Sequence, residues 1–160
     1  LLHVQLAKIR RTRGFPWQIL IPCNLYGPHD TFSTAHGHVI AGLIVKACSA
    51  DPTLVVCGTG QARRQFMYVK DLARLIAQVL TSPGPDLICA PPGDMSISDV
   101  ATLIGRQVGK QLTYDTSQSD GQMRKTGRTD LFQQQFPQFK WTPLAEGLQQ
   151  TLDWYKDHHT

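Results

Sequence analysis

The chain has 160 residues, 41% of them hydrophobic, which is enough for about one domain with a sizeable core and excludes a disordered protein. Its net charge is only +4, its basic residues cluster only at 8–13, and no apolar run approaches the roughly 18 residues that cross a bilayer. We therefore expect a soluble globular protein that binds neither nucleic acid nor membrane.

Apolar residues at helical spacing predict helices, and short apolar runs predict strands. The helices are expected at 1–13, 38–50, 70–80, 97–109 and 143–155. The strands are expected at 17–21, where Pro22 ends the run, and at 54–57, 65–69, 87–90 and 112–114. Polar, glycine-containing loops are expected at 23–37 and 115–128. Because strands and helices alternate, we predict an α/β fold.

Two acidic residues are placed to begin helices. The segment from Ser96 to Asp99 has the pattern of a capping box, and Asp71 is a candidate cap for the helix over 70–80. Both predictions concern local structure and carry no chemistry.

The four cysteines form no C-x-x-C pair, which argues against a zinc site, and we expect no metal. Cys48, Cys57 and Cys89 have apolar neighbours, which is typical of buried free thiols. Free thiols fit a reducing compartment, so we expect a cytoplasmic protein.

The loop at 23–37 is rich in Asn, Asp and His and directly follows a predicted strand. Ligands of α/β sheets bind beyond the carboxyl ends of strands, and a histidine such as His38 can act as an acid or base near neutral pH. The alternative is a turn whose Asn and Asp side chains bind their own backbone, with His38 as a helix cap.

Two further segments can hold an anionic ligand. Arg63 and Arg64 follow a Gly-Thr-Gly turn and can grip a phosphate, although a charged hairpin tip explains them equally well. Asp120 can accept a hydrogen bond from a sugar hydroxyl or a base N–H while Lys125 meets a phosphate. For this last segment the alternative is an exposed, salt-bridged loop.

Taken together, these segments resemble the GDP-L-fucose synthase family of extended short-chain dehydrogenases/reductases. The motifs that carry the resemblance are Asn-Leu-Tyr-Gly-Pro-His-Asp at 24–30, Gly-His-Val-Ile at 37–40, Gly-Thr-Gly at 58–60, Arg-Gln-Phe at 64–66, and Ser-Asp-Gly with Arg-Lys at 119–125. The resemblance implies conversion of GDP-4-keto-6-deoxy-D-mannose to GDP-L-fucose, by 3,5-epimerisation and NADPH-dependent 4-reduction. It also implies that the full-length protein is a homodimer.

The resemblance assigns roles residue by residue. His38 would be the acid or base of epimerisation. The residues that would hold NADP(H) are Pro22, Cys23, Asn24, Leu25 and His38. The residues that would hold the GDP-sugar are Lys46, Cys57, Arg64, Asp120 and Lys125.

The resemblance covers only the C-terminal, substrate-binding part of such an enzyme, with strands and helices that complete a Rossmann sheet. Residues 1–27 and 66–92 would pack on the missing Rossmann domain, and residues 28–65 and 93–160 would form the GDP-sugar domain.

The sequence also departs from the family. The glycine fingerprint, the catalytic serine, the Tyr-x-x-x-Lys pair and a partner cysteine should all precede Leu1. Cys57 stands where the family has a tryptophan, and Cys23 replaces a threonine. We therefore expect a fragment that is inactive alone. The alternative is a non-catalytic module that binds GDP or a GDP-sugar.

Overall fold

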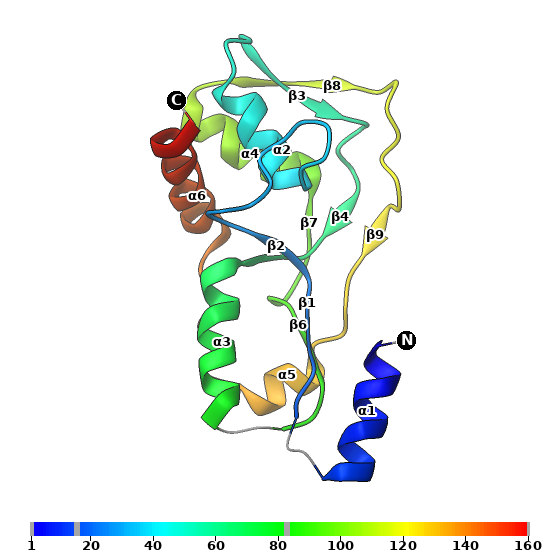
Figure 1. Ribbon diagram of the computed structural model, residues 1–160. Coiled ribbons are helices and arrows are strands. Elements are labelled where there is room, and N and C mark those ends of the chain that lie inside the picture. The colour runs from blue at the N-terminus through cyan, green and yellow to red at the C-terminus, as the bar shows by residue number, and fades with distance from the viewer. Residues whose placement is uncertain (1, 15–16, 82–83, 160) are drawn as a thin grey trace.

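The computed structural model describes residues 2–14, 17–81 and 84–159, so the predicted helix start at Leu1 lies outside the described residues. Helices and strands alternate along the chain, which confirms the predicted α/β fold (Figure 1). The helices are α1 (Leu2–Arg13), α2 (Val39–Cys48), α3 (Val69–Thr81), α4 (Ile97–Val108), α5 (Asp130–Gln135) and α6 (Leu144–His159). The strands are β1 (Leu20–Pro22), β2 (Asn24–Tyr26), β3 (Thr53–Cys57), β4 (Arg63–Arg64), β5 (Phe66–Tyr68), β6 (Leu87–Cys89), β7 (Met95–Ser96), β8 (Gln111–Asp115) and β9 (Arg124–Lys125).

The strands form small sheets. Three of them are parallel pairs, β1–β6, β2–β5 and β3–β8. The fourth is a mixed sheet with the strand order β7–β4–β9. In the mixed sheet β4 pairs antiparallel with β7 and parallel with β9. The alternative interpretation of Arg63 and Arg64 as a hairpin tip is therefore wrong, because both partners of β4 are distant in sequence.

The first strand is shorter than predicted, and Pro22 belongs to it. The Asp86 carboxylate binds the Ile19 backbone N–H at 3.0 Å, so this amide is satisfied by a side chain before β1 begins. The Cys23 N–H donates to the Cys89 carbonyl at 2.9 Å. Because successive backbone nitrogens of a strand point to opposite sides, the nitrogen of Pro22 points away from β6. A proline is tolerated at that position because it has no N–H to donate.

Both predicted loops contain short strands. The loop at 23–37 begins with β2, and the loop at 115–128 ends near β9. Helix α5 was not predicted, because only Phe132 of its six residues is buried and no apolar periodicity marks it.

Two hydrophobic cores divide the molecule, and Figure 1 shows the corresponding groups of elements at its two ends. The larger core packs α2, α4 and α6 with β3. The smaller core joins Leu75 of α3 and Leu87 of β6 to Phe132 of α5, with Phe139 and Trp141 around them. The proposed division into 1–27 with 66–92 and 28–65 with 93–160 stays a prediction.

The two helix-start predictions differ in outcome. Ser96 and Asp99 form the predicted capping box, and Gly109 ends α4 in the left-handed conformation. Asp71 does not cap α3, because the helix begins two residues earlier at Val69. Its buried carboxylate instead binds the backbone and hydroxyl of Thr142.

Within 2–14, 17–81 and 84–159, no helix is both long and apolar enough to span a membrane. The described part of the chain also holds no group of three His, Cys, Asp or Glu residues that could bind a metal ion.

Candidate functional site

A cavity of about 320 Å³ lies where β2, β3 and β4 approach the start of α2. It collects six of the residues assigned from the sequence. These are Asn24, Leu25, His38, Cys57, Arg64 and Asp120. Residues from positions 24 to 120 therefore meet at one place.

Asn24 and Phe66 fix one wall of this cavity. They lie opposite each other in the parallel pair β2–β5, and the Asn24 amide donates to the Gln65 carbonyl at 2.8 Å. Ile40 and Ile97 complete an apolar lining. A mostly apolar wall with few polar groups is typical of small-molecule sites.

His38 occupies the N-cap position of α2 with extended backbone angles, but its side chain makes no capping hydrogen bond. The imidazole is 78% exposed, and its Nδ1 lies 3.3 Å from Oδ1 of Asp30. The ring is therefore not used to cap the helix, and it stands at the cavity wall with a carboxylate beside it.

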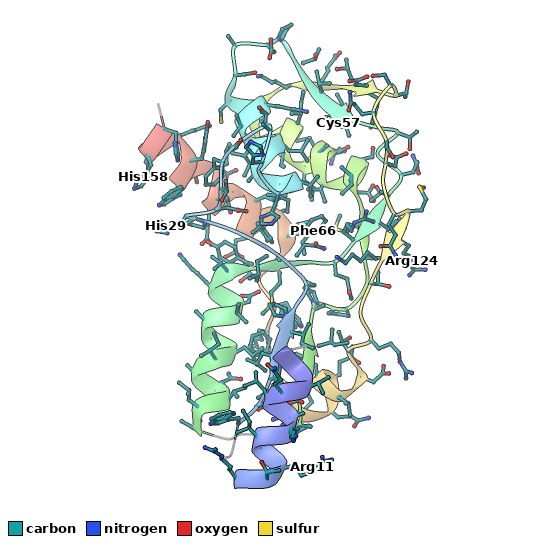
Figure 2. The ribbon with its side chains drawn as sticks, turned by 45° about the vertical axis from the view of Figure 1, so that its right-hand side comes forward. Arg11, His29, Cys57, Phe66, Arg124 and His158 are labelled. Carbon is teal, nitrogen blue, oxygen red and sulfur yellow. The ribbon has the colours of Figure 1, made fainter. Side chains whose placement is uncertain are left out.

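Cys57 and Lys46 meet at the edge of the cavity. The Lys46 ammonium donates to the Val55 carbonyl at 3.2 Å and to the Cys57 sulfur at 3.3 Å. Cys57 is exposed, so the prediction that it is buried is wrong. Burial alternates along β3, with Leu54 and Val56 facing the core, so its last residue faces outward (Figure 2).

Asp120 closes the cavity by holding the turn at 58–60. Its Oδ1 accepts from the Thr59 and Gly60 backbone N–H groups at 2.9 and 3.2 Å, and its Oδ2 accepts from the Thr59 hydroxyl at 2.6 Å. These hydrogen bonds, with the Thr59 hydroxyl first, hold the pKa of Asp120 below its ordinary value. The carboxylate is therefore ionised and already bound to the chain.

The arginines of β4 have different partners. Arg63 forms an ion pair with Asp94 at 2.7 Å, and Arg124 pairs with the same carboxylate at 2.6 Å. Arg64 donates to the Arg63 carbonyl at 2.8 Å and forms no ion pair with any residue that the structure describes. Its positive charge therefore lies unneutralised at the cavity.

A second cavity of about 310 Å³ lies beside the first and shares Asn24 with it. It is lined by Pro22, Cys23 and Lys125 among others. Burial raises the pKa of Cys23 to about 12, so this thiol stays protonated at neutral pH. The predicted cofactor residues are thus divided, with Pro22 and Cys23 here and Leu25 and His38 at the first cavity.

Residues 1–88 match the NAD dependent epimerase/dehydratase family. The chain belongs to this family. It is 34% identical to the GDP-L-fucose synthase of Dictyostelium discoideum, a match that covers 91% of this chain and 48% of that protein. The GDP-L-fucose synthase of Escherichia coli K12 is 30% identical, and that match covers 92% of this chain and 51% of that protein.

Solved structures give the same result. A GDP-L-fucose synthetase from Naegleria fowleri, in a structure bound to NADP, superposes with a TM-score of 0.86 at 30% identity, and the match covers 99% of this chain and 53% of that chain. A UDP-glucose 4-epimerase of Thermotoga maritima, at 19% identity and a TM-score of 0.77, shares the fold; that match covers 96% of this chain and 50% of that chain. The predicted resemblance is confirmed, and the chain spans about half the length of the relatives it matches.

Several lining residues of this cavity were not predicted as site residues. Ile40 and Ile97 lie in the first turns of α2 and α4, and Ala62 directly precedes β4. They are buried or half-buried apolar residues, and nothing in their local sequence indicates a ligand. Asp94 follows a Pro-Pro-Gly turn, and nothing in that pattern indicates that it binds Arg63 and Arg124.

Proposed function

We propose that this chain is the GDP-sugar-binding part of an NADP-dependent GDP-L-fucose synthase. That enzyme would convert GDP-4-keto-6-deoxy-D-mannose to GDP-L-fucose by 3,5-epimerisation and 4-reduction. The observation that carries the proposal is the single cavity in which His38, Arg64 and Asp120 meet. The similarity to two GDP-L-fucose synthases and to an NADP-bound synthetase supports it.

Arg64 is the residue that would bind the diphosphate. Its guanidinium has no carboxylate partner among the described residues, so an arriving phosphate would not have to displace one. Lys125 lies in register with Arg64 across β4 and β9 and would add a second positive charge. Arginine forms bidentate hydrogen bonds with phosphate oxygens, which fixes orientation as well as affinity.

His38 would move the protons of epimerisation. C3 and C5 of the substrate flank the C4 ketone, so removal of either proton gives an enolate that the carbonyl stabilises. Return of a proton to the opposite face inverts the carbon, and it needs a donor on that face, for which the resemblance implies the partner cysteine expected before Leu1. His38 would therefore serve one of the two faces. An exposed imidazole can take or give a proton near neutral pH, which suits this step.

The residues assigned to NADP(H) fit the nicotinamide end of the cofactor. Asn24 and Leu25 follow the carboxyl end of β1, where ligands of α/β sheets bind, and Leu25 and His38 line one cavity. When bound, the cofactor supplies the hydride that reduces the C4 ketone. Leu25 would offer an apolar surface to the planar ring, and Asn24 is held in place by its bond to Gln65.

Titration calorimetry with GDP, at two salt concentrations and with ADP as control, tests the binding half of the proposal. We expect selective binding of GDP. We expect Arg64→Ala to weaken it about tenfold or more, because a charge-assisted hydrogen bond contributes about 1.5–3 kcal/mol. Arg128→Ala removes the same charge from an exposed residue outside the cavity and should leave affinity unchanged.

An unchanged affinity in Arg64→Ala would contradict the assignment. Binding with a steep salt dependence and no preference for guanine would instead indicate a general polyanion site. A non-catalytic GDP-binding module would also bind GDP, since the same cavity serves it. Turnover by the full-length protein, and its loss in His38→Asn, separates the enzyme from that alternative.

A further inference from the structure

We propose that Asp30 is the positioning residue for His38. Its carboxylate accepts a hydrogen bond from Nδ1–H of the imidazole and so directs the unprotonated Nε2 to the cavity that His38 shares with Arg64, here called the substrate cavity. The inference rests on the proposed acid or base role of His38, and it concerns how that ring is held.

The contact favours one tautomer of the imidazole. His38 Nδ1 lies 3.3 Å from Asp30 Oδ1, and the same oxygen accepts from the Thr31 backbone N–H at 2.7 Å. An ionised carboxylate can only accept, so Nδ1 must carry the proton in this pair. In the neutral imidazole the lone pair then lies on Nε2, which is the nitrogen that can take a proton from carbon.

Burial shows that Asp30 is the fixed member of the pair. Its side chain is 13% exposed, whereas that of His38 is 78% exposed. Asp30 Oδ2 is buried and has no hydrogen-bond partner among the described residues. The carboxylate therefore has a fixed place in the fold, and the exposed imidazole takes its orientation from it.

The loop that carries Asp30 is held from two sides. Gly27 packs so closely against Val69 that a side chain there would collide with it. His29 adopts a left-handed backbone with φ of 68°, and its ring lies 4.6 Å from that of Trp154 in α6. Figure 2 shows His29 beside this helix. A left-handed backbone is uncommon in residues other than glycine, and it persists where surrounding contacts enforce it. The contact with α6 therefore holds His29, and with it the neighbouring Asp30, in place beside His38.

The imidazole stands between two cavities. A cavity of about 250 Å³ is lined by Pro28, Asp30 and His38, and the substrate cavity is lined by His38 and Arg64. Asp30 contacts the ring from the smaller cavity. The other ring nitrogen is thereby left for chemistry in the substrate cavity. Without the carboxylate, the exposed ring would rotate and exchange tautomers, and fewer molecules would present a basic nitrogen to the substrate.

Nitrogen-15 NMR of the imidazoles tests the inference without any turnover. In the wild-type protein above neutral pH, we expect the His38 proton on Nδ1. Asp30→Ala should shift the population toward the Nε2–H form, whereas Asp30→Asn should preserve Nδ1–H because its amide oxygen still accepts. His36, in the same loop, is the internal reference and should not change. A His38 tautomer that is identical in wild type and Asp30→Ala would overturn the proposal.

Kinetics of the full-length protein give the second readout. Asp30→Ala should lower kcat for epimerisation about tenfold or more with little change in KM, and Asp30→Asn should recover part of the loss. A loss of equal size in both variants, or a change confined to KM, would contradict a positioning role. If instead His38→Asn retains full epimerisation, the proposed function of His38 fails, while the tautomer measurement still decides whether Asp30 holds the ring.

Discussion

At the scale of single residues, exposure rather than residue type decides which thiol can react. The sequence places three cysteines among apolar neighbours, yet only Cys89 is fully buried, and Cys57 at the end of β3 is exposed. A strand has two faces and an end, and local composition cannot tell which of them a residue occupies. The exposed Cys57 thiol lines the cavity and contacts Lys46, so its rate of chemical modification should change when a ligand occupies the cavity.

Alkylation at pH 8 should therefore modify Cys57 much faster than Cys89 or Cys23. Burial raises the pKa of Cys89 to about 11 and that of Cys23 to about 12, so both stay protonated and unreactive at this pH. Mass spectrometry of the digested protein measures each site. Bound GDP should slow modification of Cys57 and leave Cys48, which lies outside the cavity, unaffected. Equal rates for all four cysteines would contradict the burial described here.

The same pKa shifts predict how stability changes at high pH. Burial raises the pKa of Cys89 from about 9 in the unfolded chain to about 11 in the folded one. Below pH 9 the thiol is neutral in both states, and its burial contributes fully to stability. As pH rises from 9 through 11, the unfolded chain loses this proton first, and the contribution of Cys89 to stability disappears. Urea denaturation of wild type and Cys89→Ala across this range should show a smaller pH dependence in the variant. Parallel curves would show that Cys89 does not contribute.

At the scale of elements, helices with strong apolar periodicity and strands with apolar runs were predictable, whereas two-residue strands were not. Helices α2, α3 and α4 lie within two residues of their predicted positions, and the capping box of α4 is present. Strands β4, β7 and β9 have two residues each, and partners far along the chain define them. No local pattern carries that information, because a two-residue strand exists only through its pairing.

Asp71 shows how a local prediction fails at this scale. The pattern suggests a helix cap, whereas the carboxylate is 1% exposed and ties α3 to the segment before α6. It accepts from the Thr142 N–H and hydroxyl at 2.9 and 2.6 Å and pairs with Arg74 at 2.6 Å. The contact spans 71 residues of sequence, which no helix-start pattern can reveal.

We therefore expect Asp71→Ala to lower the free energy of unfolding by about 3 kcal/mol, because it leaves a buried N–H and hydroxyl without acceptors. Urea denaturation monitored by circular dichroism measures the change. Asp130→Ala, which removes an exposed carboxylate paired with Arg128, is the matched control and should cost less than about 1 kcal/mol. A loss of similar size in both variants would show that the Thr142 contacts add nothing.

At the scale of the whole molecule, the two cores explain why the candidate site lies where it does. The larger core holds α2, β3 and α4, and the smaller core holds α3, β6 and α5. The short pair β2–β5 and the three-stranded sheet β7–β4–β9 lie between them (Figure 1), and Asn24, Arg64 and Lys125 lie on these strands. The motifs indicated these residues in advance, but their convergence depends on pairings between distant segments.

One sheet is incomplete within the described chain. Strands β1 and β6 pair only with each other, and Ile21 and Ile88 are 42% and 39% exposed. Parallel sheets are almost always covered on both faces, and a two-stranded sheet is marginal by itself. Both strands lie in the segments 1–27 and 66–92, and the predicted packing of these segments on a Rossmann domain would cover the sheet.

The 160-residue chain alone should therefore self-associate as its concentration rises, because open strand edges and exposed apolar side chains both promote pairing between copies. Sedimentation velocity over a roughly tenfold concentration range measures this. Replacing Ile21 and Ile88 together by Lys should reduce the association. Met123→Lys with Tyr114→Lys, at exposed hydrophobic residues beside β9 and in β8, should not. A chain that stays monomeric and folded at every concentration would show that β1 and β6 need no cover, and the inferred packing on a Rossmann sheet would lose its support.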